Sequence, residues 1–170
     1  NSKKMKINYG ILRYFNVCGA SPSGKIGIIS KGDHLFKNIS VAAMKKKPII
    51  KIYGNDYNTP DGTAIRDFIH VSDLAEVHYR VLNAISKSKQ SKVLNCGYSR
   101  GLSVKQVVNE FRNQINKPFQ IKFKNRRTGD MEMLIANNAI LKKLINWKPK
   151  YNNLTTIVRS CIRWEKKINS

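Results

Sequence analysis

The apolar segment YGILRYF, from Tyr9 to Phe15, constrains the fold of this chain more than any other feature. A nearly continuous apolar run of strand length is typical of a buried strand in a parallel sheet. The preceding segment, NSKKMKIN, has no initiator methionine and no signal peptide, so we expect the chain to begin partway through a longer protein. The strand would then be an interior one whose neighbours are absent, which leaves its edges unpaired.

Strand and helix patterns alternate along the rest of the chain. Short apolar runs predict strands at 48–54, 92–97 and 119–124. Apolar residues at helical spacing predict helices at 34–46, 73–87, 103–115, 137–150 and 154–162. Asp73 with Glu76, and Ser103 with Gln106, have the spacing of capping boxes, and Trp147 with Pro149 should stop the fourth helix. The predicted class is α/β with mixed connectivity.

A long polar stretch, NDYNTPDGTAIRDFIHVSDLAEVH, runs from Asn55 to His78 around a single arginine, Arg66. Such an irregular loop is costly to order, so we expect it to serve a site. On the residues alone, Arg66 could instead form a plain ion pair with Asp61 or Asp67. A second basic motif, KNRRTGD, ends at Asp130; by itself it is a weak anion-site signal, since charge runs are usually solvated.

Composition narrows the function classes. The chain has 170 residues, 41% of them hydrophobic, and a formal net charge of +22. That charge raises nucleic acid as a partner, but the lysines are spread out and aromatic residues are not interleaved with them, so we expect no nucleic-acid function. No apolar run is long enough to span a membrane.

The cysteine and histidine residues indicate neither a disulfide framework nor a metal site. Cys18, Cys96 and Cys161 are far apart, and no histidine has a ligand-like partner at short spacing. We expect three buried, reduced thiols in a cytoplasmic protein, and we interpret His70, which lies between apolar neighbours, as a structural histidine.

Five segments, in this order, resemble those of UDP-glucose 4-epimerases, extended members of the short-chain dehydrogenase/reductase superfamily. They are LRYFNVCGASPSGKIG, IYGNDYNTPDGTAIRDFIHVSDLAEVH, LNCGYSRGLSV, RRTGD and LINWKPKY. The resemblance covers essentially the whole chain, and the long Asn-Asp-Tyr loop is its most specific part. It implies the carboxyl-terminal part of a Rossmann-type enzyme, with a small mixed α/β substrate-binding domain.

The resemblance also shows what this sequence lacks. Family members carry a GxxGxxG phosphate loop and a catalytic Tyr-x-x-x-Lys with a nearby Ser or Thr, and neither motif occurs here. Residues 1–170 are therefore expected to be the UDP-sugar-binding half, without the NAD-binding Rossmann half and without catalytic residues. We expect the isolated chain to be inactive. A homodimer is an expectation for the full-length protein only, because family contacts come largely from helices of the missing half.

In the family, tightly bound NAD takes hydride from C4 of UDP-glucose or UDP-galactose, and the 4-keto sugar turns over before hydride returns. The UDP part must then be held firmly. By motif match, Arg66 and Arg127 would bind the pyrophosphate, Asp130 the ribose hydroxyls, and Asn16 the substrate near the diphosphate. Tyr14 is implied as a contact of NAD.

The remaining expected residues concern the base and the sugar. Leu35 and the backbone from Lys51 to Tyr53 match the uracil slot, with Tyr53 as its aromatic residue; a core role for Tyr53 is an alternative. His34 stands at a polar position beside Leu35. Leu134 falls where the family varies the floor of the sugar pocket, and its intermediate size predicts some turnover of N-acetylated UDP-sugars.

Other readings remain. The full protein could be another NAD-dependent nucleotide-sugar epimerase or dehydratase, although the long loop argues against this. The chain could also be a non-catalytic nucleotide-sugar-binding fragment. A basic nucleic-acid binder would show steeply salt-dependent DNA affinity, whereas a sugar-nucleotide protein would be stabilised by UDP.

Overall fold

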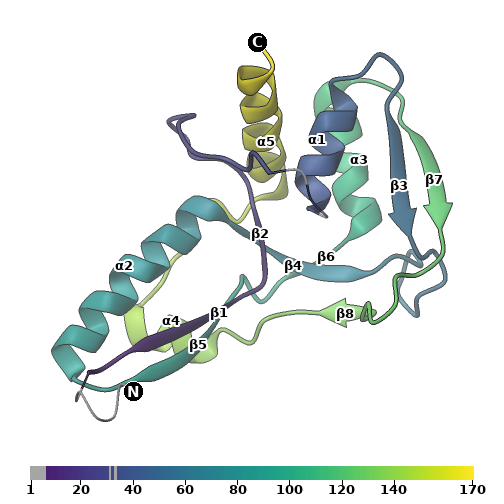
Figure 1. Cartoon of the computed structure of the whole chain (residues 1–170). Helices are drawn as coiled ribbons and strands as arrows, with labels where there is room; N and C mark the ends of the chain where they lie inside the picture. The colour runs from purple at the N-terminus through teal and green to yellow at the C-terminus, as the bar shows by residue number, and fades with distance from the viewer. Residues whose placement is uncertain (1–6, 31, 33) are drawn as a thin grey trace.

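The computed structural model describes residues 7–30, 32 and 34–170, so most of the N-terminal segment NSKKMKIN lies outside the described residues (Figure 1). The elements are, in chain order, β1 (Gly10–Tyr14), β2 (Asn16–Cys18), α1 (Leu35–Ala43), β3 (Ile49–Tyr53), β4 (Ile65–His70), α2 (Val71–Ser88), β5 (Lys92–Cys96), β6 (Gly101–Ser103), α3 (Val104–Ile115), β7 (Gln120–Lys124), β8 (Met133–Leu134), α4 (Ala139–Ile145) and α5 (Leu154–Ile168).

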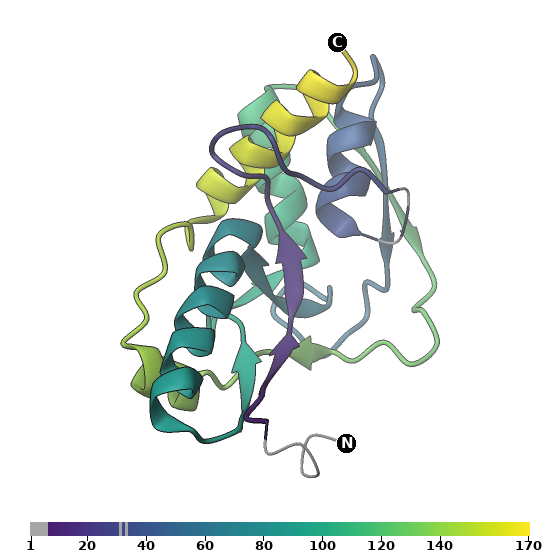
Figure 2. The same cartoon turned by 60° about the vertical axis from the view of Figure 1, so that its left-hand side comes forward.

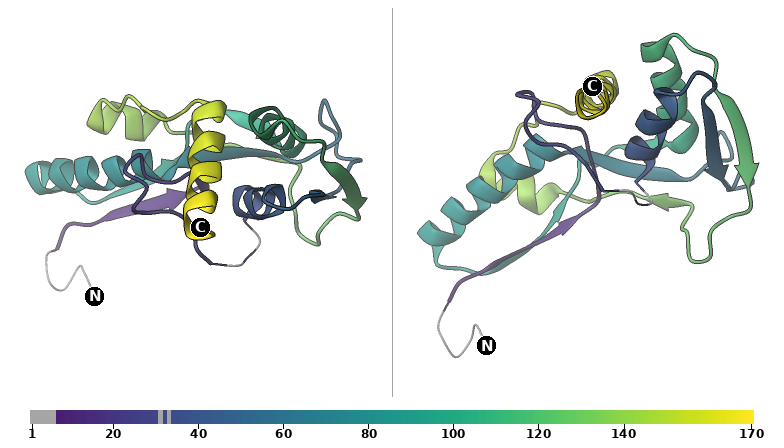
Figure 3. Two further views of the ribbon diagram at one scale, coloured as in Figure 1. Left: turned by 90° about the horizontal axis from the view of Figure 1, so that it is seen from above. Right: turned by 45° about the horizontal axis from the view of Figure 1, so that its top comes forward.

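The strands form small sheets of mixed direction. β1 pairs with β5 and β3 pairs with β7, both in parallel, and β4 lies between β2 and β6 while also pairing with β8. The β4–β6 pair is antiparallel. Figures 1 and 3 show β1, β5, α2 and α4 at one end of the molecule, and β3, β7, α1 and α3 at the other. The α/β class with mixed connectivity is confirmed.

Each end of the molecule has its own apolar cluster. The larger lies where α1, α3 and α5 meet, as Figure 2 shows for the helices, and it includes the fully buried Phe111, Ile39 and Ile52. The smaller packs α2 and α4 on β5, with Leu94 and Leu141 at its centre. β4 runs between the clusters, so a residue on β4 is fixed from both sides.

Most predicted elements are present, and the capping box of Ser103 and Gln106 is confirmed at the start of α3. The predicted cap of α2 was wrong. That helix begins at Val71, two residues earlier, and the ring of His70 accepts a hydrogen bond from the Ser72 amide at 3.1 Å. The structural interpretation of His70 is thereby confirmed.

Asp73 lies in the first turn of α2 and is fully buried, where it accepts hydrogen bonds from the Tyr98 hydroxyl and from the amides of Lys150 and Tyr151. These bonds satisfy a buried carboxylate better than a capping role would, since a buried charge needs several donors. Glu76 does not reach back to the helix start either; it pairs with Arg80 one turn later, at 2.6 Å.

The loop predicted between Asn55 and His78 is shorter in the structure. Only residues 54–64 between β3 and β4 lack regular structure, and Arg66 lies on a strand. The fourth predicted helix is shorter than expected: α4 ends at Ile145, and Asn146 follows in the left-handed conformation, while Asn138 makes no side-chain cap. β1 is a strand as predicted, but its side chains are mostly exposed.

Candidate functional site

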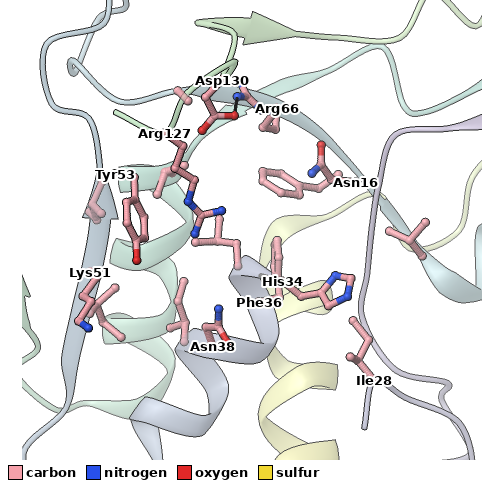
Figure 4. A pocket seen from close by; sticks show the side chains of 18 of the residues that line it. Asn16, Ile28, His34, Phe36, Asn38, Lys51, Tyr53, Arg66, Arg127 and Asp130 are labelled. Atoms are coloured by element: carbon pink, nitrogen blue, oxygen red, sulfur yellow. Dashed lines mark hydrogen bonds and ion pairs between the residues drawn. The ribbon is translucent and has the colours of Figure 1, made fainter. Parts of the chain in front are cut away.

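A cavity of about 670 Å³ opens between β3, α1, β2 and β4 (Figure 4). Its lining combines apolar side chains from the larger core with a few polar groups, as in small-molecule sites. Of the residues predicted from the sequence, those that line it are Tyr14, Asn16, His34, Leu35, Lys51, Tyr53, Arg66, Arg127 and Asp130. Residues far apart in the sequence therefore meet around one space.

The irregular segment 54–64 is held by hydrogen bonds of its own. The amide of Tyr57 donates to the Gly62 carbonyl, and the hydroxyl of Thr59 donates to the Thr63 carbonyl at 2.8 Å. Gly62 has a positive φ of 74°, and a Cβ there would lie 2.3 Å from the Asn55 carbonyl oxygen. Only glycine fits this turn, which delivers the chain to the start of β4.

Asp61 ties the same segment to the start of α3. Its carboxylate accepts hydrogen bonds from the amide and hydroxyl of Thr63 and from the Ser103 hydroxyl. Burial acts to raise the pKa of Asp61, but these hydrogen bonds outweigh it and the pKa is lowered. The loop therefore has a fixed end beside β4.

Arg66 is held by Asp130. Its Nη2 lies 2.8 Å from Oδ1 of Asp130, and its Nη1 donates to the carbonyl of Ile65 at 2.8 Å. The side chain of Arg66 is 12% exposed, so the pair is shielded on the arginine side and open on the carboxylate side, which is 34% exposed. Figure 4 shows the pair at one end of the cavity.

The alternative ion pairs of Arg66 were wrong. Asp61 accepts hydrogen bonds from Thr63 and Ser103, and Asp67 accepts hydrogen bonds from backbone amides on the other side of β4. The Asp67 carboxylate is fully buried and accepts hydrogen bonds from the backbone amides of Tyr98 and Ser99 at 2.8 Å. Neighbouring residues of a strand face opposite sides, so Arg66 and Asp67 cannot pair across it.

Arg127 and Tyr53 form the second polar group of the cavity. The guanidinium of Arg127 lies over the Tyr53 ring, 4.1 Å from its centroid, and Figure 4 shows both side chains directed into the cavity with Lys51 beside them. Tyr53 is thus at the surface of the cavity, and the alternative core role for it was wrong.

Arg126, the other arginine of this motif, turns away from Arg127. It stacks on Tyr57 at 4.2 Å and forms an ion pair with Asp56 at 2.8 Å. The hydrogen bond from Arg126 lowers the pKa of Asp56. One arginine of the motif therefore fixes the loop, while the other serves the cavity.

Tyr14 and Asn16 border the cavity from β1 and β2. The Tyr14 hydroxyl lies 2.6 Å from Nε2 of His78, whose Nδ1 lies 2.8 Å from the carbonyl of Leu74. A carbonyl can only accept, so Nδ1 carries the proton and Nε2 accepts from Tyr14. Sequence reasoning missed this role of His78, because no spacing links it to a residue 64 positions earlier.

Two further observations concern the lining of the cavity. Leu134, on β8, lies beside Arg66 in the sheet register but is not among the residues that line the cavity. Asn38, which the sequence did not single out, does line it and appears on α1 below Arg127 in Figure 4. Its position one helical turn after His34, on the polar side of α1, was the signal that could have found it.

The cysteines are free and buried, as predicted. Within residues 7–30, 32 and 34–170, no three His, Cys, Asp or Glu side chains gather in a way that could hold a metal ion. Across the same residues, the helices are too short or too polar to cross a lipid bilayer.

The sequence matches a known protein family and individual members of known function. Residues 1–97 match the family described as "NAD dependent epimerase/dehydratase family". A UDP-glucose 4-epimerase of Azospirillum brasilense is 42% identical over 159 residues, which is 93% of this chain and 46% of that protein. The chain thus spans about half the length of the relatives that it matches.

Two solved structures illustrate the likeness. The UDP-glucose 4-epimerase of Stenotrophomonas maltophila, solved with NAD and formylated UDP-arabinopyranose, has a TM-score of 0.92 and 29% identity over 99% of this chain and 50% of that one. The UDP-Glc/GlcNAc 4-epimerase of Campylobacter jejuni has a TM-score of 0.77 and 38% identity over 94% of this chain and 49% of that one. The chain belongs to the NAD dependent epimerase/dehydratase family.

Proposed function

We propose that this chain is the carboxyl-terminal, UDP-sugar-binding half of a UDP-glucose 4-epimerase, which interconverts UDP-glucose and UDP-galactose through a 4-keto intermediate. The observation that carries the proposal is the cavity in which Arg66, Arg127 and Lys51 supply positive charge beside the exposed ring of Tyr53. A dianionic diphosphate and a planar base need these groups in this combination.

Arg66 and Arg127 would bind the pyrophosphate through their guanidinium forks. Arg66 is already oriented, because Asp130 holds one of its nitrogens. Oδ2 of Asp130 makes no hydrogen bond among the described residues, so it can accept from a ribose hydroxyl while Oδ1 keeps Arg66 in place. Preorganised groups of this kind lose little entropy on binding.

Tyr53 would receive the uracil ring. The guanidinium of Arg127 covers the Tyr53 ring in the structure, so uracil and the guanidinium would compete for the same face of Tyr53. A pyrophosphate would draw Arg127 toward its oxygens and leave the face to the base. Firm binding of UDP then leaves the sugar free to turn, which an epimerase at C4 requires.

NAD, when bound, accepts hydride from C4 of the sugar and returns it to the other face. Of the residues in this chain, Tyr14 fits a role at that cofactor: it stands at the cavity, and its hydroxyl is fixed by His78. The base that removes the hydroxyl proton lies outside this chain, so we expect no epimerase activity from residues 1–170 alone. The buried thiols fit a cytoplasmic location, and a homodimer is proposed for the full-length protein only.

Calorimetric titration of the 170-residue chain with UDP tests the binding role. We expect one site for UDP, clearly weaker binding of uridine, and an increase in melting temperature with UDP concentration. Failure of UDP to bind, or equal binding of UDP and uridine, would refute the proposal. ADP provides the control for the base, because a uracil slot should reject the larger purine.

The size of Leu134 supports a second, finer proposal: the full-length enzyme also accepts N-acetylated UDP-sugars. Leu134 is 36% exposed, and its backbone lies next to that of Arg66. Parallel assays of the full-length enzyme with both substrate pairs test this. Absence of N-acetyl turnover would refute it without affecting the UDP site.

A further inference from the structure

The outer face of the β3–β7 pair carries an unusual row of lysines. Lys51 pairs in register with Lys122, and Tyr53 pairs with Lys124. Residues in register on adjacent parallel strands share a face, so these side chains stand on one side of the sheet. All four are exposed, and Figure 1 shows the pair at the edge of the molecule. We call Lys51, Lys122 and Lys124 the lysine ladder.

Among the described residues, no carboxylate forms an ion pair with the ladder. Neither β3 nor β7 contains an acidic residue, and in the described part of the chain none of the three lysines has an ion-pair partner. The neighbouring carboxylates are already used, since Asp56 pairs with Arg126 and Asp130 pairs with Arg66.

The acidic residues elsewhere explain how this arises. Three of the ten carboxylates, Asp67, Asp73 and Glu165, are buried and satisfied by internal donors, so these three contribute little to the surface. The net charge of +22 is therefore expressed outside, and the ladder is a part of it that reaches a functional cavity.

The ladder is continuous with the cavity. Lys51 and Tyr53 line it, whereas Lys122 and Lys124 stand one strand further out and are not among its lining residues. The potential at a cavity mouth attracts a charged ligand over a distance comparable to the Debye length, which is about 30 Å at 0.01 M salt and about 3 Å at 1 M. Charges outside the contact region affect encounter more than retention.

We propose that the lysine ladder steers nucleoside diphosphates into the cavity and thereby raises their association rate. The inference rests on the proposed function, because it takes UDP as the ligand. The outer lysines, Lys122 and Lys124, contribute to capture without touching the bound nucleotide. They therefore raise the association rate constant, while Arg66 and Arg127, which would contact the bound ligand, set the dissociation rate constant.

The test compares two double variants with equal loss of charge. K122Q/K124Q removes the outer ladder, and K142Q/K143Q removes two exposed lysines of α4, at the opposite end of the molecule in Figures 1 and 3. Line shapes in ¹⁵N-edited NMR spectra, recorded during titration with UDP, give both rate constants. Glutamine is uncharged and only one atom shorter than lysine, and all four positions are exposed, so the fold should not be affected.

We expect K122Q/K124Q to lower the association rate constant about twofold to fivefold at ~0.01 M salt and to leave it unchanged at ~1 M, with the dissociation rate constant unaltered. K142Q/K143Q should have a clearly smaller effect. Equal effects of the two variants, or an effect confined to dissociation, would overturn the inference while UDP binding still supports the proposed function. If the unaltered chain fails to bind UDP, both fall. Tighter binding of a uridine oligonucleotide than of UDP would also overturn it, by assigning the face to nucleic acid.

Discussion

The two parallel strand pairs, β1–β5 and β3–β7, have the same architecture and opposite surfaces. In each, one face packs on a helical layer, with Leu94 in the first pair and Ile52 in the second fully buried. The other face of β1–β5 exposes Ile11 and Val93, which are register partners and 48% and 46% exposed. The other face of β3–β7 exposes the lysine ladder instead.

The composition of each outer face indicates what surrounds it. Parallel pairs are normally covered on both sides, and an apolar outer face has the composition of a covered one. Lysines on an exposed strand prevent pairing with other chains and keep the face in water. β3–β7 is therefore suited to solvent and charged ligands, whereas the exposed face of β1–β5 has the apolar composition of a covered one.

The largest test of this comparison replaces inner and outer residues of both pairs. Leu94→Ala and Ile52→Ala should each lower the free energy of unfolding by about 2–5 kcal/mol, because each leaves a cavity in a packed cluster. Chemical denaturation measures this. Val93→Ala and Ile49→Ala are the matched outer controls, since both residues are exposed, and each should cost under about 1 kcal/mol.

Equal costs for Leu94→Ala and Val93→Ala would show that the outer face of β1–β5 is covered in solution, against the structure. A small cost for Ile52→Ala would mean that β3 is not anchored on the larger cluster.

The second test compares the two strand pairs by the effect on UDP affinity of one substitution at each. Arg127→Lys keeps the charge over Tyr53 but removes the guanidinium fork, so the affinity of the chain for UDP should fall about tenfold, or ~1.4 kcal/mol. Tyr14→Phe, on β1, removes only the hydroxyl that His78 holds and should leave the UDP affinity unchanged. Calorimetric titration with UDP measures both, and a loss in Tyr14→Phe matching that in Arg127→Lys would place UDP elsewhere.

Regular periodicity made much of the fold predictable. The apolar stripe of α5 and the capping box of α3 are local patterns, and both are present. β4 was missed because its sequence, IRDFIH, mixes charged and apolar residues. The burial of Asp67 explains that pattern, since backbone amides of Tyr98, Ser99 and Ala136 satisfy its charge, but these donors come from distant segments.

The site was predictable only in part. The resemblance identified residues that do meet around one cavity, because each motif keeps its position on the fold. It did not show that Asp130 holds Arg66, or that His78 holds Tyr14. Each of these contacts joins residues about sixty positions apart, and local patterns report nothing at that separation. Asp73 failed as a cap for the same reason: its donors lie near residue 150.

A third test uses the buried thiols to compare local opening at the two ends. Burial raises the pKa of Cys96 to about 11 and that of Cys161 to about 12, so both thiols stay neutral at neutral pH and react only when the structure opens. Cys96 ends β5, next to the exposed β1, while Cys161 lies in α5 on the larger cluster. We expect Cys96 to be labelled several-fold faster in the native chain.

Peptide mass spectrometry after timed alkylation measures both rates, and the chain unfolded in denaturant supplies the reference in which the thiols react alike. Equal native rates would mean that both ends open together, so that the comparison of the two pairs describes their surfaces but not their stability.

The smallest effect concerns His70, at the junction of β4 and α2 through which the two ends connect. Burial lowers the pKa of His70, against the opposing charge of Asp73. Just below the ordinary histidine pKa of about 6.5, the unfolded chain therefore binds more protons than the native chain. The contribution of His70 to the free energy of unfolding is complete above that pH and decreases as the pH falls below it. Protonation of Nδ1 would also remove the acceptor of the Ser72 amide.

Melting temperatures between about pH 7.5 and pH 5.5 should therefore decline in the unaltered chain. His70→Asn keeps a capping oxygen and should show a shallower decline. His34→Asn, which alters an exposed histidine that makes no side-chain cap at the start of α1, should keep the slope of the unaltered chain. If the slope persists in His70→Asn and disappears in His34→Asn, the pH response belongs to the exposed start of α1, and the junction has no part in it.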